Sequence, residues 1–328
     1  MNKKSTFHLG AIALGLLIAG QASAADEYRA LLKDRKFAEV EKATTAKLAK
    51  DPADANAMIA RSKAILGARD GRFEEAAAQA EKCVAKYPDN GSCHVAYGKA
   101  LGNKAMSEGL TAAIGYAGKI RDSFKKAVEL NPRDLDARFS LLDYYMMAPF
   151  IVGGGTGKAE TLARETAAIN AEAAKLMTAN LELKDDKLAK GEASTLAVKP
   201  GADDDLQQRH EDLLISIGNN YMSAKKFADA NRVLGEAQKR YPDSPNVAYM
   251  MGRVNQEQGK HREALAMFEQ VLVKTPLAHV HYRIGKSLQA VGDKAKASAA
   301  FEKALSFKTG LAKTQRSDAE VQLKAVKS

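Results

Sequence analysis

The sequence lacks most of the features by which enzymes and metalloproteins are recognised. It has no tryptophan, two cysteines, eight prolines and hardly any run of β-branched residues. Its six histidines form no Cys–His cluster and no His-Glu-x-x-His pattern, which disfavours a metal site. No Gly-x-Ser-x-Gly elbow occurs, and nothing singles out a pair of carboxylates for catalysis. We therefore expect no enzyme activity, no catalytic residue, no metal and no cofactor.

Long apolar runs are also missing, with one exception near the N-terminus. Residues 9–19 are apolar, follow two lysines and precede a small-x-small cleavage signal that ends at Ala24. This order is typical of a secretory signal peptide, here residues 1–24, and the run is shorter than the ~20 residues of a spanning helix. No cysteine follows the cleavage signal, which disfavours a lipid anchor. We expect a periplasmic or secreted mature chain without a transmembrane segment.

The abundant residues are alanine and charged helix formers, with lysine and arginine in excess. The net charge is +10, and removal of the two signal-peptide lysines leaves +8 (10 − 2). A basic surface can attract anionic partners. The cations are scattered along the chain, so a solvated lysine-rich helical surface explains them as well. For an exported protein we do not expect nucleic acid as the partner.

A period of 33 to 34 residues runs through the C-terminal third. Gly218, Gly252 and Gly285 mark it, and each is followed twelve residues later by an alanine. Sixteen residues after each glycine stands a large apolar residue: Leu234, Phe268 and Phe301. Small residues allow two antiparallel helices to approach, a large one fills the space between them, and a proline such as Pro242 or Pro276 ends the second helix.

With its turn glycines Gly259 and Gly292, this pattern resembles the tetratricopeptide repeat. The resemblance implies an all-α fold, a tetratricopeptide-like α-solenoid in which antiparallel helix pairs form a right-handed superhelix. It also implies that the first helix of each pair lines a concave face. The pattern decays upstream. We therefore divide the chain into a signal peptide (1–24), N-terminal repeats (25–133), degenerate repeats with a Gly-rich insertion (134–204), three regular repeats (205–310) and a capping helix (311–328).

Two segments depart from the period. Starting from Gly98, the closing Pro132 arrives about ten residues late, and we interpret the excess over 102–118 as a lengthened turn between helices. The second departure, Gly153–Gly157, invites comparison with a phosphate loop. Val152 stands where that motif needs glycine, and Ala159 stands where it needs serine or threonine. We interpret the insertion as a bulged inter-helix turn, and the sequence predicts no role for it.

Cys83 and Cys93 are the only cysteines, and an exported protein meets an oxidising compartment. They lie five residues either side of Pro88, where a helical hairpin would bring them together. We predict a disulfide. Two buried free thiols are the alternative, because small residues are favoured at both positions.

The concave side of the three regular repeats is the candidate binding surface. Helical periodicity places on it Asn219, Met222, Tyr249, Met250, Arg253, Gln256, His279, Tyr282, Arg283, Lys286 and Gln289. Tyrosine, methionine and arginine are enriched at recognition surfaces. Some tetratricopeptide proteins hold a peptide C-terminus in a carboxylate clamp. Asn219 and Arg283 match two clamp positions, whereas Ile215, Met250 and His279 depart from it. Ordinary solvated helix surface is the competing interpretation.

We predict a non-enzymatic binding or scaffold protein of the cell envelope, with a protein or peptide partner, including an anionic one, in the concave groove. The alternative is an accessory or solute- or polymer-binding subunit of a transport or polysaccharide-export system.

Overall fold

The computed structural model describes residues 28–274, 277–307 and 310–328. The predicted signal peptide and Pro276 lie outside these ranges. Within them the chain forms helices joined by short connections and no β-strand, so the predicted all-α solenoid is confirmed. Alanine, leucine, lysine and glutamate, which are strong helix formers, dominate these helices.

The described helices form seven antiparallel pairs. The first helices of the pairs are α3 (Ala55–Ala68), α5 (Gly91–Glu108), α7 (Leu135–Met147), α9 (Ala171–Lys184), α11 (Asp204–Ser223), α13 (Pro245–Glu257) and α15 (Ala278–Ala290). The second helices are α4 (Phe73–Lys86), α6 (Leu110–Leu130), α8 (Thr156–Ala167), α10 (Leu188–Leu196), α12 (Phe227–Arg240), α14 (His261–Lys274) and α16 (Lys294–Ser306). Helix α2 (Phe37–Lys50) precedes the first pair, and α17 (Lys313–Lys327) follows the last.

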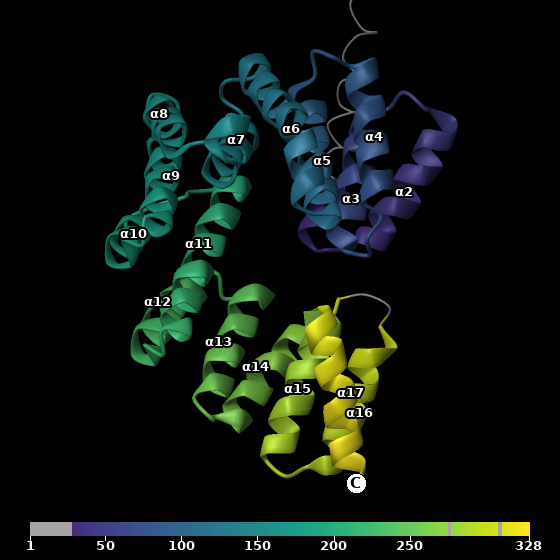
Figure 1. Ribbon diagram of the computed structural model, residues 1–328, viewed down its shortest axis with the longest axis vertical. Coiled ribbons are helices and arrows are strands. Elements are labelled where there is room, and N and C mark those ends of the chain that lie inside the picture. The colour runs from purple at the N-terminus through teal and green to yellow at the C-terminus, as the bar shows by residue number, and fades with distance from the viewer. Residues whose placement is uncertain (1–27, 275–276, 308–309) are drawn as a thin grey trace, which may run out of the picture.

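The stack coils so far that its beginning approaches its later pairs (Figure 1). Arg35, in the turn before α2, donates from Nη1 to Oδ1 of Asn246 on α13 at 3.4 Å. Lys33 forms an ion pair of 2.9 Å with Asp204 at the start of α11. These contacts join residues that are more than 170 positions apart in the chain.

The predicted close approach of glycine and a large apolar residue is confirmed within each regular pair. A Cβ added to Gly252 would lie 2.6 Å from the ring of Phe268, and one added to Gly285 would lie 2.7 Å from Phe301. Both rings are fully buried. The third glycine, Gly218, faces Leu234 in the same way. Only glycine lets the two helices of a pair come this close, which explains the period in the sequence.

The interpretation of residues 102–118 as a lengthened turn is wrong. Helix α5 continues to Glu108, α6 starts at Leu110, and Gly109 alone joins them with a φ of +97°. The extra residues therefore lengthen both helices. The glycines in this segment misled the prediction: Gly102, Gly115 and Gly118 are all helical, at sites where a Cβ would meet no atom within 4 Å.

The Gly-rich insertion forms an ordered tight bend after α7. A 3-10 turn, η1 (Phe150–Val152), is followed by Gly153 with a φ of +92°. A Cβ on Gly154 would clash with the carbonyl oxygen of Ala148, and the Gly155 amide donates to the carbonyl oxygen of Tyr145 at 2.8 Å. Backbone geometry therefore accounts for the glycines without a phosphate ligand.

Side-chain hydrogen bonds fix the helices at both ends of the regular region. Asp203 accepts a hydrogen bond from the Leu206 amide at 2.9 Å and so caps α11. Helix α17 covers the last repeat: the hydroxyl of Tyr282 donates to Asp318 at 2.6 Å, and Gln289 and Gln322 pair at 2.9 Å. This placement explains why its outer face is polar.

Candidate functional site

The structure divides the eleven predicted groove residues into two groups. Met222, Met250, Gln256 and Tyr282 are at most 8% exposed, so they pack between helices instead of lining a surface. Helical periodicity placed them on the concave side, but the neighbouring first helices cover that part of the turn. Gln256, for example, donates to Ser287 Oγ on α15 at 2.7 Å. These four residues are therefore part of the packing between helices and are not available to a partner.

The other seven predicted residues are partly exposed, and several touch each other across repeats. Tyr249 meets the ring of His279 edge to face, with centroids 4.9 Å apart. Arg253 donates to Asn219 Oδ1 at 3.2 Å. Lys286 lies 3.6 Å from Asp318 of the capping helix. The first helices α11, α13 and α15 therefore carry seven partly exposed predicted residues, of which two pairs contact each other: Asn219, Tyr249, Arg253, His279, Arg283, Lys286 and Gln289.

Two arginines lie side by side at the centre of this set. Arg283 donates to Gln256 Oε1 at 2.8 Å and lies 3.5 Å from Glu257, and its side chain is only 17% exposed. Burial, followed by the positive charge of Arg283, lowers the pKa of Arg253. The Nε atoms of both arginines are buried and have no hydrogen-bond partner among the described residues. An anion between them would satisfy these donors and relieve the repulsion.

Two further arginines reach this region from the other end of the chain. Arg35 precedes α2, Arg69 caps α3, and both have a left-handed backbone, with φ of 58° and 52°. Burial lowers the pKa of His279 to about 4, and the charges of Arg69, Arg35 and Arg283 act in the same direction. His279 is therefore neutral at pH 7, in a field of positive charge. Sequence analysis missed Arg35 and Arg69 because only the coiling of the stack brings them to α15.

The middle repeats carry a second charged cluster, but it neutralises itself. Lys99 on α5 lies 2.5 Å from Asp136 on α7, and Lys63 on α3 lies 3.8 Å from the same carboxylate. Burial alone would raise the pKa of Asp136, but these lysines hold it well below its usual range. Arg209 pairs with Asp143 at 2.7 Å. Because each charge already has a partner, the cluster gives no indication of a ligand.

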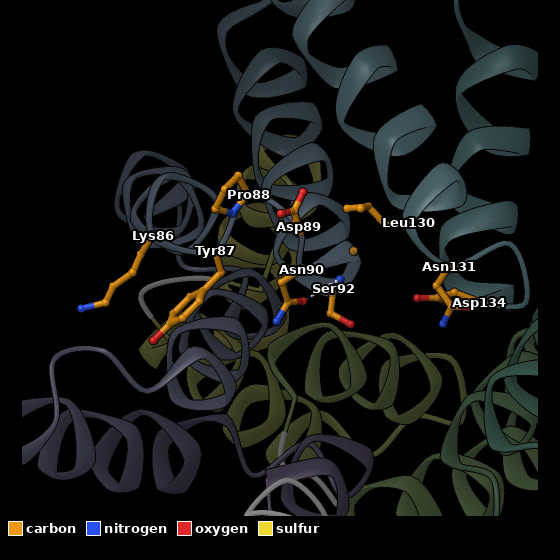
Figure 2. A pocket seen from close by; sticks show the side chains of 10 residues that line it. Lys86, Tyr87, Pro88, Asp89, Asn90, Ser92, Leu130, Asn131 and Asp134 are labelled. Carbon is orange, nitrogen blue, oxygen red and sulfur yellow. Dashed lines mark hydrogen bonds between the residues drawn. The ribbon is translucent and has the colours of Figure 1, made fainter.

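A polar hollow of about 550 Å³ lies where two successive connections meet (Figure 2). The segments 86–92 and 130–134 line it. Its amide and carboxylate oxygens already serve the backbone: Asn90 accepts from the Ser92 amide at 3.0 Å, and Asp134 accepts from the Ala137 amide at 3.0 Å. Asn90 and Asp134 therefore act as helix caps, and these two side chains are explained by the local backbone without a ligand.

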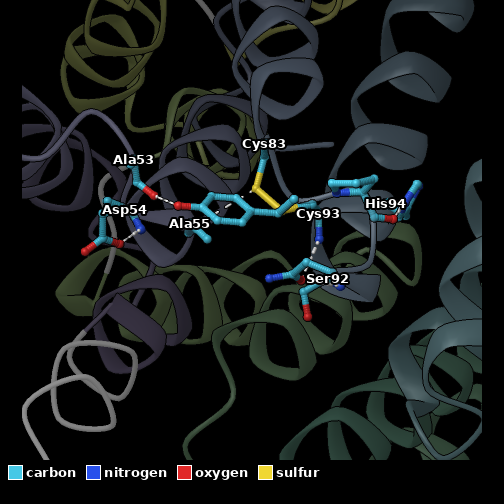
Figure 3. Close-up of a disulfide and its surroundings, with 11 residues drawn as sticks. Ala53, Asp54, Ala55, Cys83, Ser92, Cys93 and His94 are labelled. Atoms are coloured by element: carbon cyan, nitrogen blue, oxygen red, sulfur yellow. Dashed lines mark hydrogen bonds between the residues drawn. A yellow bond between two sulfur atoms is a disulfide. The ribbon is translucent and has the colours of Figure 1, made fainter. Parts of the chain in front are cut away.

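Cys83 and Cys93 are joined by a disulfide, and their Cα atoms are 5.5 Å apart (Figure 3). The bond links α4 to α5 across the connection between two helix pairs. Neither sulfur-bearing residue is exposed. Nearby, Tyr87 donates from its hydroxyl to the carbonyl oxygen of Ala53, and a ring nitrogen of His94 lies 2.7 Å from the carbonyl oxygen of Pro88. The disulfide therefore fastens an inter-repeat contact and lies away from the arginine groove.

Residues 28–274, 277–307 and 310–328 contain no group of three or more metal-ligating side chains placed to hold an ion. Within the same ranges, no helix combines the length and apolarity needed to cross a bilayer.

Models of the tetratricopeptide repeat match residues 221–290 and 278–309. No functionally curated protein matches the chain in sequence. Among solved structures, a tetratricopeptide repeat protein from Parabacteroides merdae is 15% identical, with 94% of this chain and 99% of that chain covered and a TM-score of 0.41. PilF from Pseudomonas aeruginosa is 14% identical, with 70% and 97% covered and a TM-score of 0.44. Yeast Tom70 is 12% identical, with 84% and 64% covered and a TM-score of 0.44. With TM-scores below 0.5, these structures say nothing about the function of this chain.

Proposed function

We propose that this chain, in which models of the tetratricopeptide repeat match residues 221–290 and 278–309, is a non-enzymatic scaffold of the cell envelope that acts through protein–protein interaction. Its partner binds in the groove formed by α11, α13 and α15, with Arg35 and Arg69 on the opposite side. The partner presents a carboxylate, either a peptide C-terminus or an acidic side chain, to Arg253 and Arg283.

The observation that carries this proposal is the pair of buried, unpartnered Nε atoms on Arg253 and Arg283. Glu257 lies 3.5 Å from Arg283, but no described residue accepts a hydrogen bond from either Nε atom, so a carboxylate of the partner would supply the missing acceptor. Arg69 adds a third cation that is exposed and makes no ion pair among the described residues. Tyr249 and His279 supply flat, neutral rings beside the charges. The set is suited to a segment with one anionic end and an apolar or aromatic neighbour.

The test is a fluorescence-anisotropy screen of random-sequence peptides, in pools with a free C-terminal carboxylate and matched pools with an amidated terminus. We expect the mature protein to bind members of the free-carboxylate pools more tightly. Arg253→Ala with Arg283→Ala should weaken that binding by more than ~1.5 kcal/mol, about tenfold. The helical content should stay unchanged, because neither side chain fills the core.

The matched control is Arg133→Ala with Arg262→Ala, which removes two exposed arginine charges elsewhere. It should leave binding unchanged at physiological salt. If both double variants lost the same amount of peptide affinity, the binding would be explained by general attraction between the basic protein and an anionic peptide. A double variant of the groove arginines that retains wild-type affinity at low salt would overturn the proposal. Binding of an acidic polysaccharide, but of no peptide, would favour a subunit of a polymer-export system instead.

The envelope location rests on the signal-peptide pattern of residues 1–24 and on the disulfide. Cell fractionation with N-terminal sequencing tests it. We expect the protein in the exported fraction, starting at Ala25. An unprocessed cytoplasmic chain would contradict the location and leave the groove proposal standing.

A further inference from the structure

Arg69 lies in the turn after α3, yet its charge acts on α15. After burial, the charge of Arg69 has the largest effect among those that lower the pKa of His279. Arg35 reaches the same region, because its Nη1 atom donates to Oδ1 of Asn246 near the start of α13 at 3.4 Å. The turns of the first repeats therefore face the starts of α13 and α15 (Figure 1).

No acidic residue pairs with Arg69 in the part of the chain that the structure describes. Its side chain is exposed and makes no hydrogen bond or ion pair there. The adjacent acid, Asp70, pairs with Arg72 at 2.7 Å, and Arg72 also pairs with Glu41 at 2.7 Å. On the opposite side, His279 is neutral at pH 7 and supplies no charge. Arg69 is therefore a cation that faces another surface of the molecule without an anion beside it.

Arg35 differs from Arg69 because acidic residues partly balance it. Burial, followed by the charge of Arg69, lowers the pKa of Arg35, whereas Asp212 and Glu211 raise it. Asn246, which accepts from Arg35, also donates to Glu211 at 3.4 Å. Arg35 is thus held in a network with α11 and α13. Arg69 is outside this network, so its guanidinium donors are available to another molecule.

An anionic group beside Arg69 fits the partner that occupies the groove. The charges of Arg69 and Arg283 both act on His279, so the two arginines border the same space. In the proposed function, a carboxylate of the partner meets Arg253 and Arg283. A second negative group on the same segment would meet Arg69, whereas a lysine or arginine of the partner in that place would be repelled.

We propose that Arg69 is a specificity-determining residue, which binds an acidic side chain of the same segment whose carboxylate binds Arg253 and Arg283. This inference rests on the proposed function and adds that the partner carries two negative groups. The two groups are held from two distant parts of the chain. The first repeats therefore belong to the binding site, and they select among the peptides that the groove accepts.

The test starts from a peptide that the free-carboxylate screen selects, with any acidic side chain replaced by its amide. A single Asp is then moved through the positions before the C-terminus, and each peptide is compared with the one that has Asn there. Asn has nearly the same shape as Asp and no charge. Fluorescence anisotropy at 150 mM NaCl gives the affinities. At one or two positions we expect Asp to bind about fivefold more tightly than Asn, as for an exposed ion pair.

Arg69→Gly removes the cation with little effect on the fold. The φ of Arg69 is 52°, a left-handed value that glycine adopts without strain, and the side chain has no hydrogen-bond partner to lose. In this variant the Asp and Asn peptides should bind equally, and the melting temperature should not fall. Arg69→Lys keeps the charge and should keep most of the preference for Asp.

The matched control is Lys225→Gly. Lys225 is also an exposed cation in the turn after a first helix, α11, and its φ is 59°. Its side chain makes no hydrogen bond or ion pair with a described residue. Lys225→Gly should keep the full preference for Asp. Arg253→Ala with Arg283→Ala should weaken the Asp and Asn peptides alike, which tests the proposed function separately.

Three results would overturn the inference. One is that no position favours Asp although free-carboxylate peptides bind, which would leave the proposed function standing. Another is that the preference for Asp persists in Arg69→Gly. The third is that Lys225→Gly loses the preference to the same extent, which would assign it to general attraction by a basic protein. If no free-carboxylate peptide binds at all, the proposed function and this inference are both wrong.

Discussion

The regular repeats α11–α16 and the irregular region α5–η1 are both built from antiparallel helix pairs, but they differ in how many of their large apolar side chains are buried. In the regular repeats nearly all large apolar side chains serve the stack, and each marker glycine faces a ring or a leucine. In the irregular region Gly98 and Phe124 still make that contact, but the added residues expose apolar side chains at the hairpin tips. Residues that obey the period therefore maintain the fold, whereas the added residues leave apolar side chains exposed to solvent.

The largest expected difference concerns one buried and one exposed phenylalanine. Phe268→Ala should lower the free energy of unfolding by about 3–5 kcal/mol, because it removes a fully buried ring that fills the space above Gly252. Phe150→Ala should change it by less than about 0.5 kcal/mol, because that ring is exposed. Urea unfolding followed by circular dichroism measures both values. Similar losses would mean that the insertion also belongs to the core.

Reducing the disulfide should have the next largest effect. Opening the Cys83–Cys93 bond should cost about 2–3 kcal/mol, because the unfolded chain regains the entropy of a short loop. The measurement is the free energy of unfolding in urea, with and without reductant, and the difference between the two values is the contribution of the disulfide. Thiol labelling of the unreduced, denatured protein is the control, and two reactive thiols there would show that the bond is absent.

Acid should weaken the contact of the regular repeats with the preceding helix α10 through His210. Its ring nitrogens lie 2.7 Å from the Tyr241 hydroxyl and 3.0 Å from the Thr195 carbonyl, so it joins α11 to α10 and to the end of α12. Burial lowers its pKa from 6.5 to about 4. The unfolded chain therefore binds the proton first, and stability falls as the pH decreases from about 6.5 towards 4.

At pH 5 this single histidine should account for about 2 kcal/mol of lost stability relative to pH 7. The measurement is the pH dependence of urea unfolding in the wild type and in His210→Gln. The variant keeps His279 and all carboxylates, so the difference between the two curves isolates His210. Parallel curves would contradict the assignment.

The smallest expected effect is local. Amide hydrogen exchange should be fastest over 152–157 and 197–203, where short connections replace helical hydrogen bonds, and slowest in α13 and α14. Mass spectrometry of exchanged peptides shows this directly. Uniform protection along the chain would mean that the two regions do not differ in local stability.

The sequence predicted the fold well because the period records direct contacts. The glycine-to-phenylalanine spacing and the capping helix each depend on neighbours within one or two repeats. The lengthened turn was predicted wrongly because glycine favours turns locally, whereas Gly102 lies inside the continuous helix α5 (Gly91–Glu108).

The groove was predicted less well because it depends on longer-range geometry. Helical periodicity predicts on which side of a helix a residue lies. It does not predict how much of that side the first helix of the next repeat covers, so Tyr282 and Met250 were placed on the surface although they are buried. Arg35 and Arg69 carry no sequence signal that links them to α15. Their contribution becomes visible only when the curvature of the whole stack is known.

The contacts of Lys33 with Asp204 and of Arg35 with Asn246 have a mechanical consequence. An open array of repeats transmits strain only from one neighbour to the next. Here the beginning of the chain is joined to α11 by an exposed ion pair and to α13 by one partly buried hydrogen bond, and an exposed ion pair contributes at most about 1 kcal/mol. We therefore expect these two contacts to break at little cost in free energy.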